Sequence, residues 1–155
     1  MNTRKVLCAL LFCFAIATLC VAADDSVMGT WKLNDAKSKI TAGTAKNHTV
    51  VYEAAGDSIK VTVDGDGPDG KPVHNEWTGQ FDGKDYPVTG DTASDSRSYK
   101  KVNASTLQLT NKKEGKVVAA GTIVVSKDGK TRTVTTSGTT SDGKKYKNVG
   151  VYDKQ

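Results

Sequence analysis

The chain has 155 residues, with 22 lysine and arginine side chains against 17 aspartate and glutamate side chains, and a formal net charge of +5. Its acids and lysines are interspersed, without the basic stripe and stacking aromatic residues of a nucleic-acid-binding protein, so we expect a solvated surface and no nucleic-acid partner. This length fits one domain behind a short leader.

The first 23 residues have the three parts of a secretion signal. Arg4 and Lys5 precede an apolar run over 6–21, and small residues end at Ala23. This pattern predicts a signal peptide at 1–23, cleaved after Ala23, and a single domain at 24–155. The apolar run is shorter than the roughly 20 residues of a membrane-spanning helix, so we expect no stable membrane anchor. The protein is therefore expected to be exported, to the periplasm or the extracellular space.

All three cysteines lie inside the predicted signal, at Cys8, Cys13 and Cys20. The mature chain would then have no disulfide, no thiol nucleophile and no cysteine metal ligand. Lipidation at Cys20 is the alternative. The bulky Leu19 before it departs from the small residues that normally precede a lipid-acceptor cysteine, so we favour the cleaved signal.

After the signal, glycine turns separate strand-like segments. An Asp-Gly-Lys tripeptide recurs at four of these turns, and Asp-Gly is typical of tight hairpins because both residues tolerate positive φ. Short turns make consecutive strands antiparallel neighbours. The sequence thus predicts an all-β antiparallel meander of about eight to ten strands, at 28–34, 47–54, 58–64, 73–81, 84–89, 96–102, 105–112, 116–126, 130–138 and 145–153.

Alternation within these segments indicates a sheet with one drier face. Ile59, Val61 and Val63 share one face of the segment 58–64. Trp77 and Phe81 share one face of the segment 73–81. Helix is scarce, with one short turn expected over 35–40 and Asn34 or Asp35 as its cap.

Gly29 and Trp31 open the first strand with a glycine-x-tryptophan motif that resembles the signature of lipocalins and fatty-acid-binding proteins, the calycin group. The stretches 29–39, 52–57 and 81–88 also resemble small exported bacterial lipocalin-like proteins of unassigned activity. The resemblance implies a lipocalin-like barrel or clamshell, either closed or incompletely closed.

In those barrels the tryptophan closes one end, and a basic residue from a late strand packs over it. The two arginines of the predicted mature chain, Arg97 and Arg132, do not lie on the last predicted strand. Lys154 or Lys147 is therefore the expected substitute over Trp31. Gly29, Trp31 and Lys154 are the candidate barrel-closing residues.

Large side chains on the drier face are the candidates for lining a ligand cavity, with packing of the core as the alternative role. These cavity candidates are Tyr52, Ile59, Val61, Trp77, Phe81, Leu107, Leu109, Tyr146 and Tyr152.

Metal and catalytic signals are weaker. Asp64, Asp66 and Asp69 cluster in an acidic turn, and carboxylate oxygens suit calcium, but the EF-hand spacing fails. A polar turn is the favoured interpretation. The histidines, His48 and His74, have no acidic residue at ligand spacing to both, so exposed or locally hydrogen-bonded histidines are expected and no cofactor is assigned.

Two functions from different classes remain. The favoured one is a monomeric, non-enzymatic exported protein that binds a small apolar or amphipathic ligand. The alternative is a structural or interaction module of the cell envelope, an open sheet that contacts another protein or surface component. Thr131, Thr133 and Thr135 alternate with Arg132, Val134 and Thr136, so neither face of that segment is strongly apolar. Pairing of the first and last strands discriminates the two.

Overall fold

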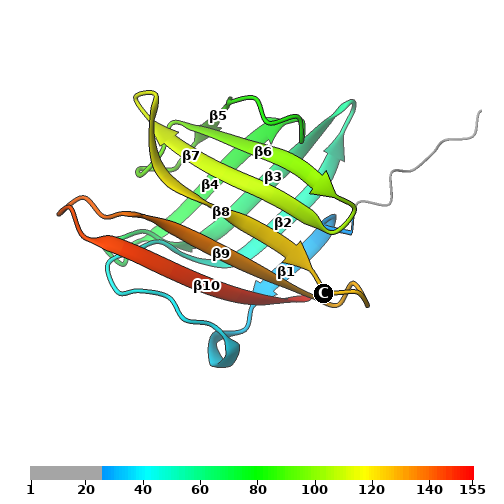
Figure 1. Ribbon diagram of the computed structural model, residues 1–155, viewed down its shortest axis with the longest axis horizontal. Helices are drawn as coiled ribbons and strands as arrows, with labels where there is room; N and C mark the ends of the chain where they lie inside the picture. The colour runs from blue at the N-terminus through cyan, green and yellow to red at the C-terminus, as the bar shows by residue number, and fades with distance from the viewer. Residues whose placement is uncertain (1–25) are drawn as a thin grey trace, which may run out of the picture.

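The computed structural model describes residues 26–155, which form a ten-stranded antiparallel barrel (Figure 1). The predicted signal peptide at 1–23 and its cleavage site lie outside the described residues. The strands are β1 (Gly29–Leu33), β2 (Lys46–Ala55), β3 (Ser58–Asp66), β4 (Pro72–Gly79), β5 (Tyr86–Thr89), β6 (Ser96–Asn103), β7 (Thr106–Lys113), β8 (Lys116–Val125), β9 (Thr131–Thr139) and β10 (Lys145–Lys154).

The ten strands follow one another as a meander, and the first pairs with the last. Trp31 of β1 lies opposite Lys154 of β10 and opposite Val50 of β2, so β1 closes the ring between them. A closed ring leaves no free sheet edge. The all-β meander and the closed form of the barrel are confirmed, and the incompletely closed form and the open-sheet geometry are wrong.

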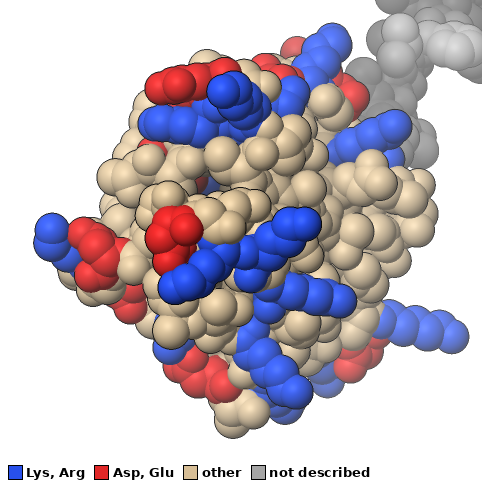
Figure 2. Space-filling model, turned by 60° about the vertical axis from the view of Figure 1, so that its left-hand side comes forward, with Lys and Arg blue, Asp and Glu red and all other residues tan. Residues whose placement is uncertain are grey.

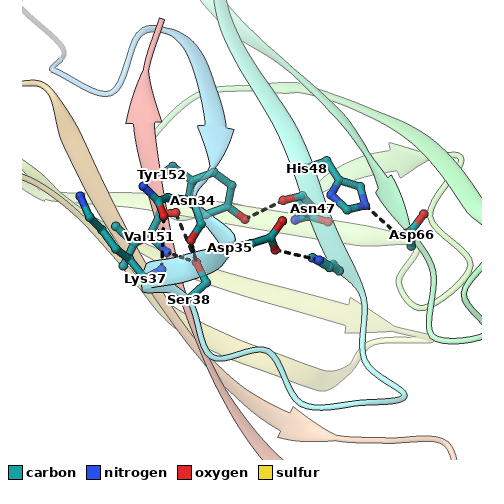
Figure 3. A network of polar contacts seen from close by, with 10 residues as sticks. Asn34, Asp35, Lys37, Ser38, Asn47, His48, Asp66, Val151 and Tyr152 are labelled. Atoms are coloured by element: carbon teal, nitrogen blue, oxygen red, sulfur yellow. Dashed lines mark hydrogen bonds and ion pairs between the residues drawn. The ribbon is translucent and has the colours of Figure 1, made fainter.

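A short 3-10 helix, η1 (Asp35–Lys37), reinforces the seam between β1 and β10 (Figure 3). Asn34 caps it, accepting a hydrogen bond from the backbone N–H of Lys37 at 3.2 Å, as the sequence predicted for one of two candidate caps. The Asn34 side chain also donates to Asp153 at 2.7 Å, and the backbone N–H of Val151 donates to Ser38 Oγ at 2.9 Å. These contacts tie the segment after β1 to β10. Within 26–155, no helix is both long and apolar enough to cross a membrane.

The Asp-Gly-Lys turns use a different geometry from the one expected. Their glycines have positive φ, but their aspartates do not. Asp82 instead accepts a hydrogen bond from the backbone N–H of Lys84 at 2.9 Å, and Asp69 and Asp128 accept equivalent bonds. The side chain thus fixes the turn, and the glycine supplies the left-handed position. Among the described residues, Glu114 alone combines a side chain with positive φ.

Aromatic rings fill a core that has few large aliphatic side chains. The Trp77 ring packs edge-on against Tyr99 with centroids 4.8 Å apart. Tyr86 covers inward-facing Gly79 so closely that a Cβ there would lie 2.5 Å from its ring. Tyrosines also cover two other inward-facing glycines, Gly138 and Gly150. This pairing lets a sequence rich in threonine and glycine fill part of its barrel interior.

Candidate functional site: the barrel interior

Two adjoining cavities occupy the interior on the side of the barrel away from Trp31. The inner cavity has a volume of about 120 Å³ and the mouth cavity about 690 Å³. The mouth cavity is bordered by the loops that join β1 to β2, β3 to β4, β5 to β6 and β9 to β10. The residues that line both cavities mark their junction: Ala45, Asn47, Arg97, Asn111, Ala119 and Tyr146.

Trp31, the candidate closing residue, lies toward the opposite end, and its side chain is fully buried. Its indole N–H donates to the backbone oxygen of Val27 at 2.7 Å. The Lys154 ammonium lies 5.2 Å from the ring centroid, and a Cβ on Gly29 would approach Lys154 Cε to 3.3 Å. The three candidate barrel-closing residues therefore lie together.

A second cation also lies over Trp31, and sequence reasoning did not assign it there. The guanidinium of Arg132, on β9, lies 5.1 Å from the Trp31 ring centroid. Lys147, the other expected substitute, is exposed on β10, where it lies opposite Ser137. The sequence-based prediction considered only basic residues of the last strand. Arg132 lies one strand away, opposite Tyr152, and faces inward.

Arg132 is the most unusual side chain of the interior. It is only 2% exposed and lies among three rings, those of Trp31, Tyr52 and Tyr152, at 4.7 to 5.1 Å. Its Nε and Nη1 are buried and have no hydrogen-bond partner within 26–155. Arg132 lines the inner cavity. Leaving two buried guanidinium nitrogens without an acceptor is costly.

Arg97 is the second buried guanidinium, and it is fully engaged. Its Nε donates to Asn111 at 2.9 Å, its Nη1 to Asn75 at 3.4 Å and its Nη2 to Asp91 at 3.1 Å. Arginine stays protonated even when buried. Since Asp91 neutralises this side chain, Arg97 and Arg132 differ in whether a counter-charge is already present.

Four tyrosines line the inner cavity, and three of them have a raised pKa. Burial raises the pKa of Tyr152 to about 12 against the opposing effect of Arg132, and it raises the pKa of Tyr99 further. Burial also raises the pKa of Tyr146. These phenols are therefore neutral at pH 7. Among residues 26–155, no aspartate or glutamate lines this cavity, and its charged groups are the two guanidiniums.

The sequence-based cavity candidates divide into two groups. Tyr52, Leu109, Tyr146 and Tyr152 line the inner cavity. The others pack in or against the hydrophobic core and line neither cavity: Ile59, Val61, Trp77, Phe81 and Leu107. Trp77 is held there by an indole N–H bond to the backbone oxygen of Arg97 at 2.8 Å. Core packing, the alternative role, describes this second group.

Each acidic residue considered as a calcium ligand instead pairs with a neighbouring basic side chain. Asp64 contacts His74 at 2.7 Å, and Asp66 contacts His48 at 2.7 Å (Figure 3). Asp69 pairs with the Lys71 ammonium at 3.1 Å. In the described part of the chain, no group of three acidic, histidine or cysteine side chains could hold a metal ion. Both histidines thus have local carboxylate partners, and neither lines a cavity.

Surface charges are mixed on the face shown in Figure 2, where acidic side chains lie among grouped lysines. Some charged side chains of the surface pair with a neighbour in the same turn, such as Lys144 with Asp142 at 2.9 Å and Lys84 with Asp82 at 3.3 Å. Such exposed pairs contribute little to stability.

The structure is similar to two redesigned β-barrels. One, mFAP1 bound to DFHBI, has 19% identity and a TM-score of 0.44, covering 85% of this chain and 98% of that chain. The other, b11L5F_LGL, has 17% identity and a TM-score of 0.43, covering 86% of this chain and 95% of that chain. A scan of protein-family models and a search of curated proteins find no match.

Proposed function

We propose that the barrel binds a small amphipathic molecule with one acidic group, and that this group lies against Arg132. The observation that carries the proposal is the buried Arg132 guanidinium, whose Nε and Nη1 lack an acceptor and which lines the inner cavity. The protein acts as an exported, monomeric, non-enzymatic carrier or receptor of this ligand.

The energetics favour an anion. Each ring contact of Arg132 is worth about 0.5–2 kcal/mol, whereas burying an ion without a counter-charge costs several kcal/mol. At these values the three rings offset a large part of the cost, but because they are uncharged they supply no counter-charge. A carboxylate would accept charge-assisted hydrogen bonds from the free Nε and Nη1 and supply the missing counter-charge.

The cavity dimensions and walls set the shape of the ligand. The inner cavity, at about 120 Å³, approaches the roughly 150 Å³ that admits a benzene-sized molecule. Val50, Val63, Leu109 and Ile123 supply apolar wall. The acidic group and a few carbons fit here, and the rest of a longer molecule extends past Tyr146 into the mouth cavity.

Calorimetry with matched probes tests the proposal. Octanoate carries the acidic group, and 1-octanol has the same chain length without the charge. Charge-assisted hydrogen bonds are worth about 1.5–3 kcal/mol, so octanoate should bind roughly ten- to a hundredfold more tightly than 1-octanol. Arg132→Met should remove that preference, with Arg132→Gln as a second variant.

Lys147→Gln is the matched control, because it removes one positive charge from the outer side of β10. It should keep the wild-type preference. Circular dichroism and thermal unfolding establish that each variant is folded before its affinity is compared. Absence of octanoate binding to the wild type, or equal octanoate affinity in wild type and a folded Arg132 variant, would reject the proposal.

A further inference from the structure

We propose that Asp91 determines the charge of the ligand: by occupying Arg97 it restricts the barrel to molecules with one acidic group and excludes those with two. This inference rests on the proposed function, because it concerns the second guanidinium of the same interior.

Arg97 is placed where a second acidic group would otherwise bind. It lines both the inner cavity and the mouth cavity, whereas Arg132 lines only the inner one. A ligand whose first acidic group lies on Arg132 and whose chain extends outward therefore passes Arg97. A guanidinium at this junction would attract a second carboxylate if its charge were free.

That position is already taken by a carboxylate of the chain itself. Asp91 Oδ2 accepts hydrogen bonds from Arg97 Nη2 at 3.1 Å and from Ser94 Oγ at 2.6 Å. Its Oδ1 accepts from the backbone N–H of Ala93 at 2.9 Å. Ser94 and Arg97 are both buried, so two of the three donors to this carboxylate are shielded from solvent.

The loop that carries Asp91 is anchored at both ends. A Cβ on Gly90, at its start, would overlap the backbone oxygen of His74, so the chain passes in close contact with β4. At its end, the backbone N–H of Asp95 donates to the backbone oxygen of Lys112 at 2.9 Å. Asp91 is thus positioned by the fold and does not need a ligand to place it.

The charged side chains that face the interior leave one positive charge without a partner, which a single negative charge would neutralise. The guanidiniums are Arg97 and Arg132, and the acidic residues lining the mouth cavity are Asp91 and Asp69. Asp69 pairs with the exposed Lys71 at the rim. One cation, Arg132, remains without a counter-charge. A second acidic group near Arg97 would meet the Asp91 carboxylate and be repelled.

Competition between octanoate and dicarboxylates from hexanedioate to decanedioate tests this inference, with affinities measured by calorimetry. The wild type should bind octanoate at least tenfold more tightly than any dicarboxylate. Asp91→Asn keeps the side-chain shape and frees the Arg97 charge, so it should raise the affinity for the best dicarboxylate at least tenfold relative to octanoate. The Asp91→Asn/Arg97→Gln double variant removes both charges and should restore the wild-type preference.

Asp64→Asn is the matched control, since it removes one negative charge from a residue that lines neither cavity. It should leave the ratio of the two affinities unchanged. If the wild type binds octanoate but folded Asp91→Asn keeps the wild-type ratio, the role of Asp91 is wrong and the role of Arg132 stands. If the wild type binds none of these acids, the proposed function fails, and this inference fails with it.

Discussion

Arg132 and Trp31 lie against each other inside the barrel, with the guanidinium carbon 5.1 Å from the centroid of the indole ring. One side chain thereby has two contacts of different kinds. It packs over the tryptophan that closes one end, and it also borders the inner cavity with two donors that lack an acceptor. The first contact contributes to the barrel structure, and the second predicts a ligand.

Removing the Arg132 charge should not weaken the empty barrel. We expect Arg132→Met to leave the melting temperature unchanged or to raise it, because an apolar side chain of similar length avoids the cost of an unpaired buried ion. Thermal unfolding without ligand measures this effect. A melting temperature lowered by more than about 10 °C, which corresponds to roughly 3 kcal/mol or more for a domain of this size, would mean that the ring contacts outweigh desolvation.

The close cover of Gly79 by Tyr86 predicts a destabilising substitution. Gly79→Ala places a methyl group 2.5 Å from the Tyr86 ring and should cost about 1–3 kcal/mol of unfolding free energy, the usual range for overpacking. Urea denaturation measures this cost. Thr78→Ala, at the neighbouring outward-facing position, is the control and should cost less. Equal costs at the two positions would contradict the tight packing.

A substitution in the turn between β7 and β8 should stabilise the protein. Glu114 has φ 49° and precedes Gly115 at φ 74°, a pair of left-handed positions typical of a two-residue type I′ hairpin. Asparagine tolerates this conformation better than glutamate does, so Glu114→Asn should raise the unfolding free energy by about 0.5–1 kcal/mol. The same change at Glu53, within β2, should give no gain. Denaturant unfolding of both variants compares them.

His74 should titrate above its ordinary pKa. A hydrogen bond with the Asp64 carboxylate is the main cause that raises the His74 pKa above 6.5. Its contribution to stability is therefore complete below about pH 6.5 and is lost as the pH rises through the raised pKa. An NMR titration of the His74 ring should show this pKa, and Asp64→Asn should bring it back toward 6.5. An unshifted wild-type titration would contradict the Asp64 contact.

The strands were predictable because turn chemistry and alternation both act locally. All ten predicted strands are present, and no end differs by more than two residues. Closure was not predictable, because it depends on Trp31 and Leu33 meeting Lys154 and Tyr152 at the far end of the chain. No local pattern specifies which distant strands pair.

The candidate site was predictable only in part, because alternation of large apolar side chains identifies the drier face of a strand but not a buried charge. This alternation correctly predicted the cavity residues Tyr52, Leu109, Tyr146 and Tyr152. Arg97 and Arg132 were missed as cavity residues, because each lies between two small polar residues and no apolar alternation marks the inward face of β6 or β9 there.

The position of a bound carboxylate tests the central claim most directly. A crystal structure of the octanoate complex should show a carboxylate oxygen about 2.7–2.9 Å from Nε or Nη1 of Arg132. A complex in which octanoate fills the interior with its carboxylate at the mouth, and Arg132 still lacks an acceptor, would contradict it.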